Sequence, residues 1–184
     1  SRSNDVRAAT DELAELMRKE IISAKEDGDS VGGIVECMVE GLPMGLGEPF
    51  FDTVEGELAK MMFAVPGVKG IEFGAGFRAA SMRGSQHNDP FVLVDGKVRT
   101  AKNDAGGILG GITNGMPVVF RAAIKPTASI ARGQRSLDLK SGRQTDLKIE
   151  GRHDPCIAPR AVPVIEGAAA LVLADLSMRG GTVD

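Results

Sequence analysis

Tryptophan and tyrosine are absent from this chain of 184 residues, and its seven aromatic residues are all phenylalanine. Few aromatic rings are therefore available to stack on bases or sugars, which argues against nucleic-acid and carbohydrate binding. The charges give the same indication, because 22 Lys and Arg residues against 25 Asp and Glu leave a net charge of −3. A chain without a basic excess has no general electrostatic attraction for nucleic acid or an anionic membrane.

Cysteine is also scarce. The two thiols, Cys37 and Cys156, lie far apart and outside any C-x-x-C pattern, so neither a disulfide framework nor a structural metal site is expected. No apolar run approaches the roughly 20 residues that a membrane-spanning helix needs. These absences predict a cytoplasmic protein in a reducing compartment, with no metal and no membrane partner.

Glycine, by contrast, is abundant, with 24 residues. The GG and G-x-G groups stand between apolar runs rather than in a polar linker, which indicates tight turns and close approach of backbone segments. The length of the chain suits one domain with a substantial core.

Helical spacing and cap residues predict three helices, over residues 5–27, 52–65 and 163–180. Asn4 or Asp5 would cap the first, and Asp52 with Glu55 would form a capping box for the second. Pro163 would lie in the first turn of the third, which would end at Gly180-Gly181.

Alternating apolar residues predict strands at 31–40, 68–73 and 118–124, and hairpins at 91–100 and 136–150. Asp95-Gly96 and Ser141-Gly142 have the chemistry of two-residue hairpin turns. Because the strands group in hairpins rather than alternating strictly with helices, the predicted fold class is α+β.

Two glycine-rich stretches match nucleotide-binding loops only in part. GAGFRA at 74–79 follows a strand, but the SMRGSQHNDP stretch after it shows no helical periodicity, so the helix N-terminus that a dinucleotide site needs is not expected. GGILGGITNG at 106–115 lacks the G-K-[ST] ending of a P-loop. The favoured interpretation of the second stretch is a buried turn where two backbones touch.

A cation and two hydroxyls follow the predicted strand 118–124. They are Lys125, Thr127 and Ser129, in the sequence KPTAS. This group could hold a phosphate through one charge-assisted and two neutral hydrogen bonds. Alternatively, the segment is an ordinary exit from the strand.

The stretch GRHDPCIAPRAVP at 151–163 places Arg152, His153 and Asp154 before a proline, which favours an extended or turning backbone. Arg152 and Asp154 could brace the loop as an ion pair, and His153 could be a loop histidine with satisfied hydrogen bonds. A metal site is disfavoured because there is no second ligand cluster, and Cys156 is disfavoured as a nucleophile because it would need a base.

Other polar residues leave alternatives open. Arg160 could pair with Glu166 at the start of the last helix, or it could face an anionic substrate. Arg83 and Gln86 could line a cleft.

Five of these segments, in this order and at this spacing, resemble those of chorismate synthases. They are GDSVGG at 28–33, MRGSQ at 82–86, GGILGGI at 106–112, KPTAS at 125–129 and GRHDPC…PRAVP at 151–163. The resemblance covers essentially the whole chain and matches the C-terminal half of the enzyme. We therefore expect residues 1–184 to form the C-terminal portion of a single chorismate synthase domain.

The resemblance implies a lyase of the shikimate pathway to the aromatic amino acids. Its reaction is the 1,4-elimination of phosphate from 5-enolpyruvylshikimate-3-phosphate to give chorismate. Reduced FMN is the implied cofactor, and NADP is associated with the family. The implied fold is a β-α-β sandwich, and the implied assembly is a homo-oligomer, a tetramer in the intact enzyme.

The same resemblance implies site residues. The family's FMN contacts fall on the following positions: Pro66, Gly67, Gly110, Lys125, Pro126, Thr127, Ala128, Ser129 and Arg152. The family more often has Asn-Ala at 66–67 and Ser at 128, so those side-chain contacts differ here. Asp154 matches the aspartate that helps to move the ring proton near flavin N5, for which a carboxylate base is chemically apt.

The family's two catalytic histidines, in G-E-S-H-G and G-H-x-D segments, have no counterpart in the 184 residues, and neither His87 nor His153 replaces them. We therefore expect negligible turnover from this chain alone. The alternative is a catalytically inert structural or oligomerisation fragment that binds no flavin.

Overall fold

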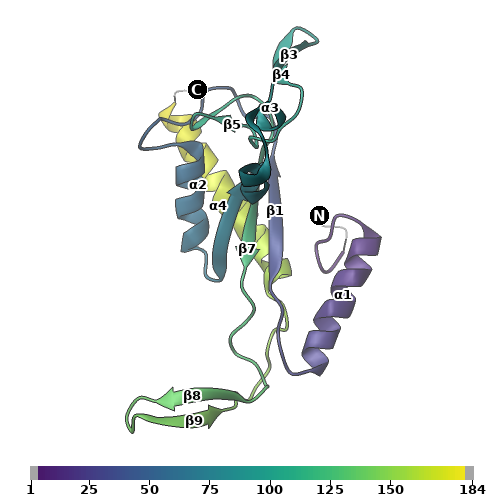
Figure 1. Cartoon of the computed structure of the whole chain (residues 1–184), viewed down its shortest axis with the longest axis vertical. Helices are drawn as coiled ribbons and strands as arrows, with labels where there is room; N and C mark the ends of the chain where they lie inside the picture. The colour runs from purple at the N-terminus through teal and green to yellow at the C-terminus, as the bar shows by residue number, and fades with distance from the viewer. Residues whose placement is uncertain (1–3, 181–184) are drawn as a thin grey trace. The chain divides into compact units, whose positions relative to one another are not determined.

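The computed structural model describes residues 4–180 (Figure 1). Two compact units divide the chain. The first combines the residues up to 33 with 124–162, and the second combines 34–123 with the residues from 163 onward. Helices and strands are mixed in the chain, as the predicted α+β class requires.

The first unit contains one long helix, α1 (Asp11–Glu26), which Thr10 caps by accepting a 3.2 Å hydrogen bond from the Leu13 N–H. The predicted start at Asn4 or Asp5 was wrong. Asn4 makes two cap-like hydrogen bonds, but both go to the backbone of Ala8 within a loop. Val6, Ala8 and Ala14 bury a small core beneath this loop.

The first unit also contains a two-stranded hairpin, β8 (Gln134–Asp138) and β9 (Arg143–Leu147). The predicted hairpin is confirmed, but its turn spans the four residues 139–142 rather than Ser141-Gly142 alone, because Asp138 pairs with Arg143; Gly142 in this turn has a φ of +66°. Two of its cross-strand pairs, Arg135 with Asp146 and Asp138 with Arg143, have opposite charges. Such pairs stabilise a hairpin whose strands are exposed.

The second unit is built on a sheet of three strands in the order β1 (Gly33–Val39), β7 (Val118–Ile124) and β2 (Val68–Phe73). Side chains alternate across β7, so that Val118, Phe120 and Ala122 are fully buried. The ring of Phe120 lies 5.9 Å from that of Phe73. Helix α2 (Val54–Ala64) packs against β2, and α4 (Ala158–Arg179) runs behind β7 in the view of Figure 1.

The starts of these two helices differ from the predictions. Thr53, not Asp52, caps α2 by accepting from the Gly56 N–H. The helix α4 begins at Ala158, so Pro163 lies inside it rather than in its first turn. Pro159 occupies the first turn instead, where the missing N–H would have had no partner within the helix. Gly181, part of the predicted end, lies outside the described residues.

Among residues 4–180, α4 is long and apolar enough to cross a bilayer by length and composition alone. A core helix passes the same test, and one side of α4 is buried in the second unit. The buried side chains are Ile165, Ala168, Ala169, Val172, Leu173 and Leu176.

Two short hairpins belong to the second unit. The predicted one joins β3 (Phe91–Val94) and β4 (Lys97–Thr100) through Asp95 and Gly96, both with positive φ. The other was not predicted: β5 (Ile108–Leu109) and β6 (Ile112–Thr113) pair within the glycine-rich stretch. Their turn is Gly110-Gly111, with φ of +59° and +86°, which glycine adopts without strain.

Two short helical segments occur where the sequence showed no helical periodicity. They are the 3₁₀ helix η1 (Gly76–Ser81) and the single turn α3 (Gly84–His87). The Phe77 N–H at the start of η1 donates to Glu72 Oε2 over 3.0 Å. Because a carboxylate already occupies this terminus, the GAGFRA motif does not present these donors to a pyrophosphate.

Replacing Phe120 tests the core. Phe120→Ala should lower the free energy of unfolding by about 3–5 kcal/mol, because it leaves a cavity between the sheet and the helices. Phe51→Ala is the matched control, since Phe51 is 93% exposed while Phe120 is 0% exposed. Urea unfolding followed by circular dichroism measures both variants, and an equal loss in the two would contradict this assignment of the core.

Candidate functional site

The residues predicted to contact FMN fall into two groups. The segment Lys125–Ser129 belongs to the first unit with Arg152, and so does Asp154. Pro66, Gly67 and Gly110 belong to the second unit. Each group has its own local geometry.

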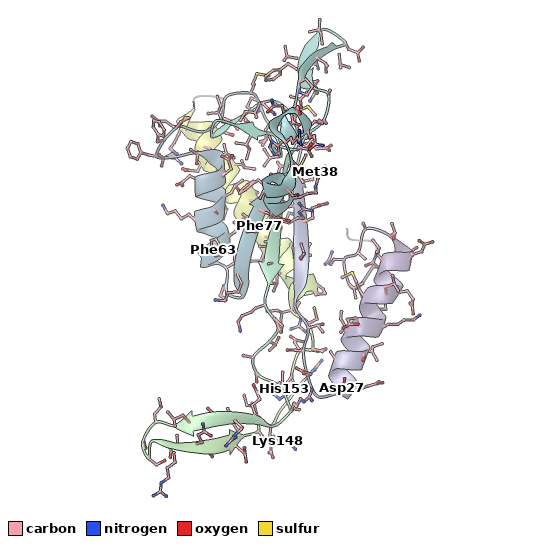
Figure 2. All side chains as sticks on the ribbon, in the orientation of Figure 1. Asp27, Met38, Phe63, Phe77, Lys148 and His153 are labelled. Carbon is pink, nitrogen blue, oxygen red and sulfur yellow. The ribbon has the colours of Figure 1, made fainter. Side chains whose placement is uncertain are left out.

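His153, labelled in Figure 2, joins two stretches of the first unit. Its Nδ1 lies 3.1 Å from the Ser129 hydroxyl oxygen, and its Nε2 lies 3.0 Å from the Ile149 carbonyl oxygen. Because a carbonyl only accepts, Nε2 carries a proton and donates to Ile149, while Nδ1 is hydrogen-bonded to the Ser129 hydroxyl. Both ring nitrogens are thus engaged, as the interpretation of His153 as a satisfied loop histidine requires.

The stretch GDSVGG holds both candidate segments of the first unit in place. The Ser30 hydroxyl donates to the Thr127 carbonyl over 2.7 Å, and the Val31 N–H donates to the Pro155 carbonyl over 2.8 Å. A Cβ atom on Gly32 would lie 2.5 Å from the Ile124 carbonyl oxygen, so only glycine fits there. The sequence motifs assigned no role to Ser30 or Gly32. The local feature that could have indicated one is a serine hydroxyl close to the glycine pair Gly32-Gly33.

Asp154 forms an ion pair with Arg160, with Oδ2 2.6 Å from a guanidinium nitrogen. This pair replaces the Arg152–Asp154 brace that the sequence suggested. Arg160 lies in the first turn of α4, where a cation is disfavoured by the helix dipole. Its side chain instead turns back to the loop and pairs with the Asp154 carboxylate.

Two cations of the first unit, Lys125 and Arg152, have no carboxylate partner among residues 4–180. In the same part of the structure, the buried hydroxyl oxygen of Thr127 has no hydrogen-bond partner. Unpaired positive charges and an unsatisfied hydroxyl on these segments suit an anionic ligand such as a phosphate ester. The residues present therefore fit a phosphorylated cofactor.

Arg152 also lines a cavity of about 230 Å³ in the first unit. Lys25, in the last turn of α1, lines the same cavity. Asp29 contributes a carboxylate, but Arg132 pairs with it at 3.3 Å. The cavity therefore has a net positive lining.

In the second unit, Gly67 and Gly110 both occupy turns with positive φ. Gly110 is exposed, and no atom lies within 4 Å of where its Cβ would be, so its backbone is open to a ligand. The adjacent Gly111 is anchored, because its carbonyl accepts a 2.9 Å hydrogen bond from the Val54 N–H at the start of α2.

A buried carboxylate fixes the chain that leads into this glycine-rich hairpin. The Asp89 side chain is 0% exposed and accepts from Lys102 Nζ at 3.1 Å and from the Asp104 and Ala105 N–H groups at 2.9 and 2.8 Å. Lys102 also lies 2.6 Å from an oxygen of Asp104. No motif had marked Asp89 or Lys102.

Gln86 serves the local backbone rather than a cleft. Its Oε1 accepts a 2.9 Å hydrogen bond from the Arg83 N–H and closes the turn of α3.

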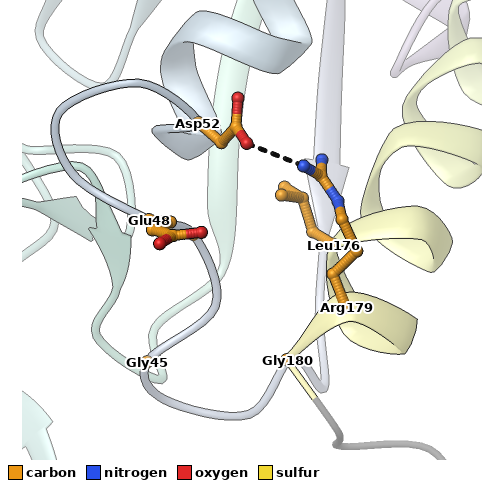
Figure 3. A pocket seen from close by; sticks show the side chains of 7 residues that line it. Gly45, Glu48, Asp52, Leu176, Arg179 and Gly180 are labelled. Atoms are coloured by element: carbon orange, nitrogen blue, oxygen red, sulfur yellow. Dashed lines mark hydrogen bonds and ion pairs between the residues drawn. The ribbon is translucent and has the colours of Figure 1, made fainter.

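Another cavity of about 230 Å³ lies in the second unit beside the end of α4 (Figure 3). Arg179 crosses it to Asp52 at 2.9 Å and also pairs with Asp175 and Glu57, at 2.8 and 3.8 Å. Because three carboxylates surround this cation, the cavity has no free positive charge for an anionic ligand.

Acid stability tests the buried network. The hydrogen bond from Lys102, with a further contribution from Arg78, lowers the pKa of Asp104 below its usual 3.8. A depressed carboxyl pKa stabilises the fold above the unfolded value and loses that contribution as the pH falls through the folded value. Asp104→Asn should therefore lower stability near neutral pH and flatten the loss of stability below about pH 4.

Thermal unfolding measured across this pH range checks the prediction. Asp95→Asn, at the exposed turn between β3 and β4, is the control. If the stability of Asp104→Asn falls as steeply with decreasing pH as that of the parent chain, the role given to this ion pair is contradicted.

Hydrogen exchange tests the contacts of His153. Loss of two hydrogen bonds in His153→Ala should raise amide exchange in residues 149–154 by about thirtyfold, given about 1 kcal/mol for each bond. His87→Ala, whose ring makes no hydrogen bond to a described residue, should leave this loop unchanged. Unaltered exchange in His153→Ala would show that the loop does not depend on the histidine.

The family of the chain is shown by comparison. A sequence model of the chorismate synthase family matches residues 1–178. Curated chorismate synthases from Korarchaeum cryptofilum and Methanosarcina barkeri are 54% and 51% identical to the chain over 176 and 179 residues, which are 96% and 97% of the chain and 49% of each relative. The enzyme of Dehalococcoides mccartyi strain 195 is 56% identical over 163 residues, which are 89% of the chain and 45% of the relative.

A crystal structure of chorismate synthase superimposes on 92% of the chain and 44% of its own length, with a TM-score of 0.74 and 32% sequence identity. The chain thus spans about half the length of the relatives it matches. Because sequence and fold agree over nearly all of the 184 residues, the chain belongs to the chorismate synthase family.

Proposed function

We propose that this chain supplies the flavin-binding part of a chorismate synthase, which removes phosphate from 5-enolpyruvylshikimate-3-phosphate by 1,4-elimination to give chorismate. The supporting observation is that Lys125 and Arg152 are unpaired within residues 4–180, and that the buried Thr127 hydroxyl of the same unit has no hydrogen-bond partner. A site for an anionic cofactor and an anionic substrate needs such unpaired positive charge.

Reduced FMN, when bound, would supply electron density transiently as phosphate departs. The ammonium of Lys125 and the guanidinium of Arg152 would bind the anionic groups, with the Thr127 hydroxyl as a further donor. In the second unit, taken by itself, the backbone of Gly110 is open to a ligand without a side chain in the way. The Asp154 carboxylate would help to move the ring proton, and Arg160 pairs with that carboxylate at 2.6 Å.

Turnover would require more than these residues. The family's two catalytic histidines have no counterpart in the 184 residues, and both ring nitrogens of His153 are already engaged. We therefore infer negligible activity for the chain alone. Full activity would belong to a family member of full length, a cytoplasmic homotetramer.

A second candidate is a structural or oligomerisation fragment that binds no flavin. Two features of KPTAS favour it. Ala128 provides no hydroxyl where the family more often has serine, and the Ser129 hydroxyl already bonds to His153. A flavin phosphate would thus meet fewer donors in this segment.

Titration of FMN, followed by the anisotropy of flavin fluorescence, distinguishes the two. The absence of tryptophan and tyrosine removes their emission and their quenching of the flavin. The flavin-binding proposal expects saturable binding that Lys125→Ala weakens by about ten- to a hundredfold, as for loss of a charged hydrogen bond. Lys148→Ala, at an exposed lysine of the same unit, should bind like the parent chain. Binding that does not saturate would favour the structural fragment.

A turnover assay tests the inferred inactivity. With reduced FMN and 5-enolpyruvylshikimate-3-phosphate under anaerobic conditions, the purified chain should form no measurable chorismate. The intact enzyme of Korarchaeum cryptofilum, assayed in parallel, is the positive control. Chorismate formation at a rate near that of the control would overturn the inference.

A further inference from the structure

The Ser129 hydroxyl has one proton, and the contact with His153 determines which group receives that proton. The hydroxyl oxygen lies 3.1 Å from Nδ1 of the ring, and this is the only hydrogen bond of the Ser129 side chain to the described residues. Nε2 donates to the Ile149 carbonyl over 3.0 Å, because a carbonyl can only accept. The protonation of Nδ1 alone therefore sets the direction of the bond to Ser129.

The neutral and the protonated ring use this hydroxyl in opposite ways. Since Nε2 already carries a proton, Nδ1 of the neutral ring is an acceptor, and Ser129 must donate its one proton to it. Only the lone pairs of the hydroxyl are then left, and they cannot donate to a phosphate oxygen. In the protonated ring Nδ1–H donates to the Ser129 oxygen, and the hydroxyl proton is free for another acceptor.

His153 also lines the cavity of about 230 Å³ in the first unit, together with two cations, Lys25 of α1 and Arg152. The carboxylate of Asp29 lines the same cavity, but it pairs with Arg132 at 3.3 Å. An anion that enters the cavity thus meets free positive charge close to the imidazole ring. Protonation of the ring would add a further positive charge to this lining.

The carboxylates of the neighbouring chain are not free partners for a protonated His153. Asp154 pairs with Arg160 at 2.6 Å. Lys148 and Glu150, which precede the loop, are exposed, so solvent and salt screen their charges. The opposite charge for a protonated ring would therefore come from a ligand, and a phosphate ester brings up to two negative charges.

We propose that His153 is a positioning residue for the phosphate of FMN. The ring takes up one proton from solvent as the phosphate binds, and Nδ1–H then leaves the Ser129 hydroxyl free to donate to a phosphate oxygen. Lys125 and Arg152 contribute fixed charges, whereas His153 contributes one that depends on pH. This inference rests on the proposed flavin site.

A histidine that only braces the loop would behave differently. Its two hydrogen bonds form with either direction of the bond to Ser129, so a brace links no proton to ligand binding. A positioning role does link them, and linkage is reciprocal: the phosphate favours the proton, and the proton favours the phosphate. The affinity for FMN should therefore rise as the pH falls and decline as the pH rises.

Titration of FMN between about pH 6.5 and about pH 8 tests the linkage, because imidazoles titrate in this range while a phosphate monoester is mostly dianionic. The dissociation constant should increase about three- to tenfold over the range, below the limit of about tenfold per pH unit for one proton. His153→Gln, which does not titrate, should show a constant affinity. His87→Ala is the matched control, since it removes the only other histidine and should keep the pH dependence.

Substitution of Ser129 tests the route through the hydroxyl. Ser129→Ala should weaken FMN binding by about three- to tenfold at about pH 6.5, where the hydroxyl donates, and by less at about pH 8. Ser129→Thr retains a hydroxyl and should restore the pH dependence. If Ser129→Ala depends on pH as steeply as the parent chain, the proton acts through its charge alone, and the positioning role is overturned.

Nitrogen-15 NMR of the imidazole rings measures the proton directly. The chain has two histidines, so His87→Ala assigns both rings. At about pH 7.5, Nε2 of His153 should be protonated with and without ligand, and Nδ1 should gain a proton when FMN saturates the chain. Riboflavin, which lacks the phosphate, should leave Nδ1 unchanged. An Nδ1 that FMN does not protonate would contradict the proposal.

The outcomes separate this inference from the flavin site on which it rests. Saturable FMN binding with the same affinity throughout the pH range, or with equal pH dependence in the parent chain and His153→Gln, would overturn the role of His153 and leave the flavin site standing. Absence of FMN binding at every pH would overturn the flavin site, and the role of His153 with it. Circular dichroism establishes that each variant is folded, and if His153→Gln is not, Ser129→Ala carries the test with the ring in place.

Discussion

The carboxylate of Asp89 is the interaction on which the glycine-rich part of the second unit depends. A fully buried carboxylate is costly unless donors surround it, and three do so here, all from residues 102–105. Gly106 follows directly, with a backbone so close to Gly74 that a Cβ would lie 2.5 Å from the Gly74 nitrogen. One buried charge thus determines where the tight turns begin and where the β5–β6 hairpin is placed.

Elements with strong local signals were predictable from sequence. The alternation in β7 predicted its strand correctly, and Asp95-Gly96 predicted its hairpin and turn. Ser141-Gly142 predicted the second hairpin, although its turn spans residues 139–142. The predicted helix starts were wrong where two residues close in sequence could each begin the helix. Asn4, like Thr10, can bond to backbone N–H groups, and Pro163, like Pro159, suits a first turn. Local chemistry allows both choices, and only the packing around them selects one.

For the candidate site, sequence identified segments but not their partners. Residues 151–163 were recognised as chemically rich, yet the ion pair of Asp154 is with Arg160 rather than Arg152, because α4 begins early enough to bring Arg160 back to the loop. Ser30, Asp89 and Lys102 escaped notice because their roles depend on contacts with distant residues. Such contacts leave no periodic pattern in the sequence.

The loop of residues 151–157 is held at several points by the chain itself. His153 bonds to Ser129 and Ile149, the Pro155 carbonyl accepts from Val31, and Arg160 holds Asp154. A ligand that binds here would meet groups already ordered and would lose little affinity to conformational entropy. Recognition by this loop would therefore resemble the fit of two rigid bodies, with an association rate that is not limited by loop rearrangement.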